Sequence, residues 1–352
     1  MKDIQRFLAV ALGASALISA VTTVRATNGN PINSGSAQKY TVSVIGDVPY
    51  GDRKIAAFPQ FIDFINADPK VDIVVHLGDI KSGSTWCSDE YFQFISEQFD
   101  RLKDPLVFTP GDNEWTDCHR LNNNQYLPVE RLAKLREVFF PVPGETIGGR
   151  HKRVLTQGGD PAFSDFVENV IWMESKVIFA TLNVPGSNND GVETNPWRAP
   201  WDSAFYKLLQ AEEQESRNAA NMDWLHKTFE MAAANGAMGV VLMLQADMWD
   251  GTTAELNAYP PLVAAIGHEA LAFGGPVLLL VGDSHTYTVD NPYDPASPLH
   301  AIHPGTPDVP NITRVIVQGS TTAPNEFEYL RLTIDPRSPD LFSWDRVPFE
   351  IP

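Results

Sequence analysis

The sequence predicts an α/β fold in which two mixed β-sheets pack face to face with helices on the outer sides, a four-layer α/β/β/α sandwich. Short apolar, β-branched runs alternate with segments of helical spacing, which is typical of β-α-β units with parallel strands. Further apolar runs near the C-terminus follow one another without helices between them, so we expect antiparallel strands there. No change of composition marks a linker, and residues 40–352 are therefore expected to form one domain.

The first half of the chain contains three apolar runs that we expect to be strands, and amphipathic segments between them. The expected strands are Tyr40–Ile45, Val71–Leu77 and Leu106–Thr109. Apolar residues at helical spacing predict helices over 59–67 and 128–140, and Ser88 is placed to cap a helix that extends to Leu102.

The second half predicts a hairpin, a long loop, two more β-α units and a group of closing strands. The hairpin is expected over 169–173 and 176–183, and the loop over 184–200; loops of that length in compact domains are usually functional or mobile. Helices are expected over 217–234 and 261–273, and strands over 240–244 and 277–281. The last three apolar runs, 312–317, 329–334 and 341–347, are expected to be antiparallel strands that close the second sheet.

Composition excludes several classes of function. The 43% hydrophobic content is typical of a packed core and not of a disordered chain. The formal net charge of −18 opposes binding to nucleic acid and to anionic lipid. Clustered carboxylates are also natural sites for cations, so bound metal ions can offset part of this charge.

The N-terminus has the features of a signal peptide. Lys2 and Arg6 precede a mostly apolar run, Phe7–Val21, and Val24-Arg25-Ala26 offers a small-residue cleavage site. We therefore expect residues 1–26 to be removed, residues 27–39 to be a flexible lead-in, and the mature protein to be secreted or periplasmic. The apolar run is too short and alanine-rich for stable membrane insertion, although an uncleaved anchor is the alternative.

The two cysteines, Cys87 and Cys118, each lie shortly after an expected strand end. In an oxidising compartment they are expected to form a disulfide. A metal-binding pair is disfavoured, because the chain has no Cys-x-x-Cys spacing.

Four apolar runs end in Gly-Asp, which places Asp47, Asp79, Asp112 and Asp283 directly after expected strands. A single Gly-Asp has an ordinary explanation, in which Gly allows a sharp turn and Asp caps it. Four such endings, with His285 two residues after the last, predict instead that several carboxylates converge on one rim of the fold.

The order of these motifs resembles the calcineurin-like metallophosphoesterases, a family that includes the purple acid phosphatases. The matching segments are Gly46-Asp47, Gly78-Asp79-Ile80-Lys81, Gly111-Asp112-Asn113-Glu114, Gln245-Ala246-Asp247 and Gly282-Asp283-Ser284-His285. The resemblance covers roughly residues 40–290 and implies a β-α-β core.

The resemblance implies roles for individual residues. Asp47 would bind a first metal ion and Asp79 would bridge two ions. Asp112 falls at an Asn ligand position of the family, and Asn113 falls at the His that assists the leaving group. The implied ligand set as a whole is Asp47, Asp79, Asp112, Asn113, Gln245, Asp247, Asp283 and His285.

The chain departs from the family mainly by losing histidines. Pro49, Asn113, Gln245 and Asp283 replace family histidines, so the ligand set is rich in oxygen and favours Mg, Mn or Ca over Zn or Fe, with one or two ions bound.

Other residues are candidates for the remaining roles. His119 or Asp117 would have to protonate the leaving group in place of Asn113, and Lys81 and Arg120 are candidates to bind substrate phosphate. His76, by contrast, is expected to be a core histidine with satisfied hydrogen bonds.

Together these observations predict an exported, metal-dependent hydrolase of a small-molecule phosphate ester. The main alternative is a catalytically degenerate phosphoesterase scaffold that binds a metal or another ligand. A second alternative is an esterase with Ser284 as nucleophile; it is disfavoured, because His285 is adjacent in sequence and would point elsewhere.

Overall fold

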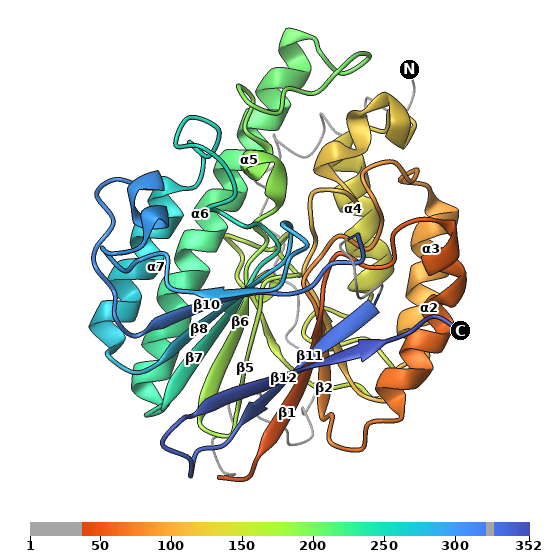
Figure 1. Cartoon of the computed structure of the whole chain (residues 1–352). Helices are drawn as coiled ribbons and strands as arrows, with labels where there is room; N and C mark the ends of the chain where they lie inside the picture. Colours follow the sequence, from red (N-terminus) through yellow and green to blue (C-terminus); the bar gives the residue numbers. More distant parts are fainter. Residues whose placement is uncertain (1–36, 322–326) are drawn as a thin grey trace, which may run out of the picture.

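The computed structural model describes residues 37–321 and 327–352. The expected signal peptide 1–26, and the lead-in as far as residue 36, lie outside the described residues. Two β-sheets face each other, and helices cover the outer face of each (Figure 1). The side chains between the sheets form one apolar layer to which both contribute, for example Val44 and Val75 from one sheet and Val241 and Leu278 from the other. This arrangement confirms the predicted α/β/β/α class.

The smaller sheet has five strands in the order β12-β11-β1-β2-β3. β1 is parallel to β2 and β2 to β3, whereas β11 and β12 are antiparallel additions on the other side of β1. Its strands are β1 (Tyr40–Ile45), β2 (Ile73–His76), β3 (Leu106–Phe108), β11 (Phe327–Ile334) and β12 (Phe342–Phe349). Its outer face packs on helices α2 (Asp52–Asn66), α3 (Asp89–Phe99) and α4 (Pro128–Phe139).

The larger sheet has seven strands in the order β4-β5-β6-β7-β8-β10-β9. They are β4 (Leu155–Thr156), β5 (Val170–Glu174), β6 (Val177–Thr181), β7 (Gly239–Met243), β8 (Val277–Val281), β9 (Thr288–Asp290) and β10 (Ile312–Ile316). Its outer face is covered by α6 (Ala204–Ala234) and α7 (Pro260–Phe273). Short helical turns are α5 (Gly186–Asp190), η1 (Thr116–His119), η2 (Leu121–Asn123), η3 (Gln157–Gly159) and η4 (Pro298–Ile302).

The closing strands differ from the prediction. Of the three predicted closing strands, β11 and β12 pair with each other in antiparallel fashion, and they extend the smaller sheet. β10 lies in the larger sheet, where it is parallel to β8 through the pair Ile312 and Val277 and antiparallel to β9. An apolar run shows that a strand is buried, but its partner depends on the path of the connection, here residues 282–311.

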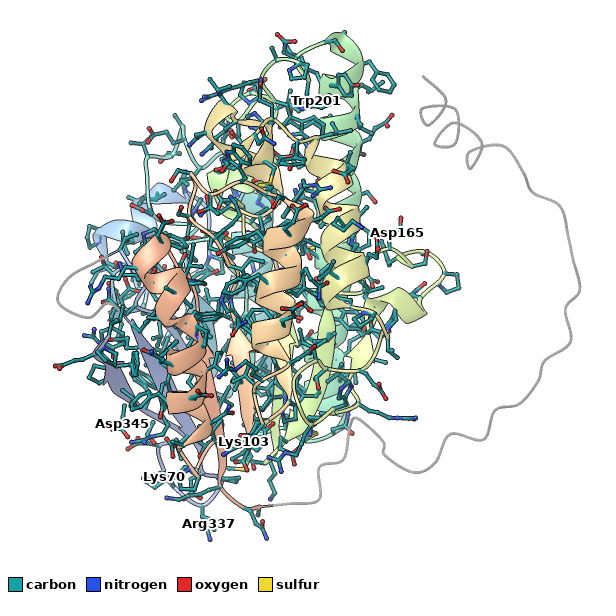
Figure 2. All side chains as sticks on the ribbon, turned by 90° about the vertical axis from the view of Figure 1, so that its right-hand side faces the viewer. Lys70, Lys103, Asp165, Trp201, Arg337 and Asp345 are labelled. Carbon is teal, nitrogen blue, oxygen red and sulfur yellow. A yellow bond between two sulfur atoms is a disulfide. The ribbon has the colours of Figure 1, made fainter. Side chains whose placement is uncertain are left out.

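Two helices begin earlier than their apolar spacing indicated. α2 starts at Asp52 and carries Pro59 in its interior, where the missing N–H removes one helical hydrogen bond. α6 starts at Ala204 and extends beyond the sheets, so its first turns stand above the rest of the molecule (Figure 1). Figure 2 shows Trp201 at this end, and Lys70 and Arg337 at the opposite end. No helix within the described ranges combines the length and apolar character needed to cross a bilayer.

The predicted disulfide is confirmed. Cys87 and Cys118 are joined, with their Cα atoms 5.8 Å apart, and the bond ties the loop before α3 to η1. Both sulfur atoms lie near the backbone carbonyl of Asn113, so this cross-link supports the segment that follows β3.

Candidate metal centre

The carboxyl ends of parallel strands place five predicted site residues on one rim. Asp47, Asp79 and Asp112 follow β1, β2 and β3, and Gln245 and Asp283 follow β7 and β8. Hydrogen bonds from backbone to side chain join the strand ends of the two sheets, because the backbone N–H of Asp283 donates to both carboxylate oxygens of Asp47 at 3.1 and 3.2 Å. The predicted convergence of Gly-Asp endings is therefore present in the structure.

The glycines of these endings are required because a side chain at these positions would collide with neighbouring residues. A Cβ on Gly111 would lie 2.2 Å from Asp79 Oδ1, and one on Gly282 would lie 2.7 Å from Asp47 Oδ2. Positive φ values occur at Gly78 (92°) and also at three of the aspartates: Asp47, Asp79 and Asp283 have φ values of 56°, 59° and 71°. Left-handed backbone at non-glycine residues is uncommon and often accompanies functional sites.

Three of the rim residues come close enough to share one cation. Ligand atoms of Asp47, Asp79 and His285 all lie within 4.8 Å of one another, and we call these residues the ion group. His285 Nε2 is 3.4 Å from Asp47 Oδ1, and its Nδ1 lies 2.6 Å from Thr321 Oγ1. The hydroxyl thus fixes the ring, as partners of metal-binding histidines commonly do.

Asp79 is held by donors on both of its oxygens. The Tyr50 hydroxyl donates to Oδ2 at 2.8 Å, and the backbone N–H of Asn113 donates to Oδ1 at 3.1 Å. The Asn113 side chain also donates to Asp79 Oδ2, and the Asp79 backbone N–H donates to Glu114 Oε1 at 3.0 Å. Asn113 therefore orients Asp79.

The electrostatics of the rim fit a divalent cation. Burial, reinforced by the charges of Asp112 and Glu114, raises the pKa of Asp79 well above its usual value, and burial also raises the pKa of Asp47. Burial alone would lower the pKa of His285, but the hydrogen bond to Asp47 and its charge raise it. Buried carboxylates that repel one another are relieved by a cation, and a set of two carboxylates and one imidazole is suited to Mg²⁺ or Mn²⁺.

Asp112 has different surroundings from the ion group. The Ser187 hydroxyl donates to its Oδ2 at 2.6 Å, and the Gln245 amide donates to its Oδ1 at 3.2 Å. The Gln245 side-chain oxygen in turn accepts the backbone N–H of Gly186. Both carboxylate oxygens of Asp112 are thus engaged by donors that the α5 turn carries or fixes.

A cavity of ≈ 500 Å³ opens beside Asp112 and Asp283. Its other lining residues include Arg120, Ser187, Asp250 and Tyr259. Arg120 is the one cationic side chain among the described residues that line it. Arg120 Nη2 donates to Ser187 Oγ at 3.2 Å and its Nη1 pairs with Asp117 Oδ2 at 2.5 Å, so the position of the guanidinium is fixed.

Asp117 and His119, the candidates for leaving-group protonation, are buried in η1 behind this cavity. Asp117 Oδ1 lies 3.1 Å from Ser187 Oγ, whose one hydrogen has its shorter contact with Asp112, and burial raises the pKa of Asp117 to about 7. His119 Nδ1 accepts the Arg198 backbone N–H at 3.0 Å, and burial lowers its pKa to about 4. Neither is among the residues that line the cavity.

Lys81 and Asp247 have structural partners. The Lys81 ammonium is fully buried and donates to Asn113 O at 2.6 Å, Ser82 O at 3.0 Å and Asn123 Oδ1 at 3.2 Å, which uses its three hydrogens. Asp247 forms an ion pair with Arg314 and also accepts the Ser284 hydroxyl. The structure thus accounts for both side chains without a ligand, and it gives Ser284 a carboxylate partner in place of a histidine.

Three residues of this site were not singled out from the sequence: Tyr50, Ser187 and Thr321. Tyr50 follows the first Gly-Asp ending closely, so its place near the rim could have been anticipated from that loop. Ser187 lies in the 184–200 loop, whose length alone suggested function. Nothing in the sequence around Thr321 indicates its contact with His285.

Comparison with known proteins gives one informative match. A model of the family described as calcineurin-like phosphoesterase matches residues 40–227, more than half of the 352-residue chain. No curated protein matches. A solved structure titled "GAP50 the anchor in the inner membrane complex of Plasmodium" is similar over 89% of this chain and 89% of that chain, with 7% identity and a TM-score of 0.41. A likeness at that level carries no argument about function.

Proposed function

The chain belongs to the calcineurin-like phosphoesterase family, and from this premise we propose that it hydrolyses a phosphate ester with the help of a divalent metal ion held by the ion group. The observation that carries the proposal is the approach of Asp47, Asp79 and His285 to within 4.8 Å, at a buried rim with excess negative charge. The oxygen-rich set favours Mg²⁺, Mn²⁺ or Ca²⁺.

A bound divalent ion would neutralise phosphate oxygens and lower the pKa of a coordinated water. The chain's own contribution is to orient the ligands. Tyr50 and Asn113 fix the carboxylate of Asp79, and Thr321 fixes the ring of His285. These contacts reduce the reorganisation that ion and substrate binding would otherwise require.

The cavity beside the rim supplies the place for the substrate. Its volume of ≈ 500 Å³ suits a small molecule. Arg120 contributes positive charge to a wall whose other charged residues are acidic, and its Nε is buried without a hydrogen-bond partner. The acidic residues are Asp112, Asp247, Asp250, Glu255 and Asp283. We assign Arg120 to binding of the substrate's phosphate oxygens, because a guanidinium matches their geometry.

A second candidate function is ligand binding without catalysis. It is favoured by the engagement of Asn113 and Gln245, which occupy family histidine positions and whose side chains are committed to Asp79 and Asp112. The side chain of Asn113 therefore orients a carboxylate and leaves the leaving group without an evident donor. The binding function uses the same ion group as the hydrolytic function, but the bound ligand is not hydrolysed.

Hydrolysis assays on metal-free and reloaded protein separate these functions. We expect p-nitrophenyl phosphate or bis(p-nitrophenyl) phosphate to be cleaved after addition of Mn²⁺ or Mg²⁺, by wild type and by Ser284→Ala, but not by Asp79→Asn. Comparison of the two substrates distinguishes monoesterase from diesterase activity. Ion binding without turnover of either substrate would favour the binding function. Activity that withstands a chelator and is lost in Ser284→Ala would favour the esterase.

We also propose that the protein acts outside the cytoplasm, on the basis of the N-terminal sequence pattern. N-terminal sequencing of protein recovered from the culture medium or periplasm should show a chain that starts near Thr27. Recovery only of cytoplasmic protein that retains Met1 or Lys2 would contradict export.

A further inference from the structure

The α5 segment is a turn of left-handed helix built from residues other than glycine. Ser187, Asn188, Asn189 and Asp190 have φ values of 50°, 51°, 55° and 57°. L-residues usually visit this conformation singly, because each one costs free energy through contact between Cβ and the backbone. Four in succession persist only where surrounding contacts impose them.

Those contacts come from three directions. From the residue that precedes α7, the Tyr259 hydroxyl accepts the Asn189 N–H at 2.9 Å. From α6, Arg217 NH2 and Gln214 Nε2 donate to Asn189 O at 3.1 and 3.0 Å. From the following loop, Trp197 Nε1 donates to both Asp190 oxygens at 3.2 Å. The turn is thus fixed before any ligand binds.

The fixed turn contacts the carboxylate of Asp112. Ser187 donates directly to Asp112 Oδ2, and Gly186 holds the Gln245 amide that donates to Oδ1. Gly186 itself cannot carry a side chain, because a Cβ there would lie 2.8 Å from Asp283 Oδ1. The turn is therefore fitted against Asp112 and Asp283, two acidic residues that are not members of the ion group.

We propose that this turn restricts the centre to one metal ion by clamping Asp112. The clamp consists of Gly186, Ser187 and Gln245. A second cation would have to compete with the donors on both oxygens of Asp112, and the turn prevents Ser187 from withdrawing. Asp79 also accepts hydrogen bonds on both oxygens, but its ligand atoms lie within 4.8 Å of those of Asp47 and His285, whereas among the described residues Asp112 belongs to no such group. Asp112 remains beside the cavity as a hydrogen-bonded carboxylate. The inference rests on the proposed function only for the ion at Asp47, Asp79 and His285.

Ser187→Gly is the variant that tests the clamp. Glycine adopts φ near 50° readily, so the change removes the hydroxyl and relieves backbone strain together. Ser175→Gly is the matched control: Ser175 has φ 48° and donates its hydroxyl to Gln38 O at 2.6 Å, in the β5–β6 hairpin at the opposite end of the strands. Thermal melting should show that neither variant is unfolded at the temperature of the titration.

The readout is the number of Mn²⁺ ions bound by metal-free protein, from calorimetric titration and from the electron paramagnetic resonance spectrum. We expect wild type and Ser175→Gly to bind one ion with the spectrum of an isolated Mn²⁺. Ser187→Gly should bind a second ion and show a spin-coupled pair.

Each contrary result has a distinct meaning. Two coupled ions in wild type would overturn the clamp and leave the proposed metal-dependent function standing. One ion in wild type and still one in Ser187→Gly would overturn the role of Ser187. No ion in wild type would overturn both the clamp and the metal-dependent function.

Discussion

The ion group and the clamped Asp112 lie at the same rim, follow the same kind of strand ending, and yet are prepared for different tasks. In the ion group, two carboxylates and an imidazole approach one another with the hydroxyls of Tyr50 and Thr321 behind them. At Asp112, the two carboxylate oxygens accept from Ser187 and Gln245, and among the described residues Asp112 belongs to no group of three ligands that could share a cation. A Gly-Asp ending thus determines where a carboxylate lies, whereas the neighbouring loops determine what it can bind.

The largest expected effect follows from neutralising Asp79, the carboxylate at the centre of the ion group. In Asp79→Asn we expect phosphate-ester hydrolysis to fall by at least about 1,000-fold, because a metal ion supplies several kcal/mol of charge stabilisation and each 1.36 kcal/mol is a factor of ten. Asp250→Asn, a cavity residue outside the ion group, is the control and should keep bound Mn²⁺. Equal Mn²⁺ binding by wild type and Asp79→Asn would contradict the assignment of Asp79.

The disulfide lies beside Asn113, which holds Asp79, and we expect its loss to affect the stability of this segment more than the clamp at Asp112. Replacing Cys87 and Cys118 by Ser should lower the free energy of unfolding by about 3–4 kcal/mol, because the cross-link closes a loop of 31 residues. Guanidinium unfolding of the two proteins, with and without reductant, measures this difference. An unchanged stability in the double variant would show that the bond does not constrain the unfolded chain.

His76 lies on β2, the strand that leads to Asp79, and predicts a dependence of stability on pH. Burial lowers its pKa to about 4, while its Nε2 lies 3.1 Å from Val48 O and its Nδ1 accepts the Gly78 N–H at 3.2 Å. Because the folded pKa is below the unfolded value near 6.5, its contribution is complete above pH 6.5 and is lost as pH falls towards 4. The loss amounts to about 3 kcal/mol.

Urea unfolding of wild type and His76→Gln at pH 7 and pH 4.5 isolates this contribution. The difference between the two proteins cancels that of His119, whose pKa is also lowered to about 4. We expect wild type to lose more stability than His76→Gln over this range. An equal loss in both would show that folding does not lower the pKa of His76.

The smallest expected effect concerns the partner of His285. Thr321→Val removes the hydroxyl 2.6 Å from His285 Nδ1 and should weaken Mn²⁺ binding about tenfold, the lower end of the cost of losing a metal ligand's hydrogen-bond partner. Thr194→Val is the control on the clamp side, since Thr194 contacts Asn188 and not the ion group. Similar Mn²⁺ affinity in wild type and Thr321→Val would indicate that the ring needs no such support.

Much of the rim was predictable from the sequence, because parallel strands bring their carboxyl ends together. Asp47, Asp79 and Asp283 could be placed by that rule alone, and the burial of His76 followed from its apolar strand. The clamp could not be predicted, because a left-handed turn at Ser187 depends on tertiary contacts from α6 and from Tyr259 that no local pattern encodes. The sheet to which β10 belongs was mispredicted for a related reason, since apolar runs do not identify their partners.

The most direct test of the central claim is a titration of metal-free protein with Mn²⁺ in which bound metal and the initial rate of p-nitrophenyl ester hydrolysis are measured together. The account predicts that the rate rises in proportion to occupancy and reaches its plateau at one ion per chain, while Asp79→Asn stays at the uncatalysed rate. Hydrolysis that is already maximal in the presence of excess chelator, or full occupancy without any rise in rate, would contradict it.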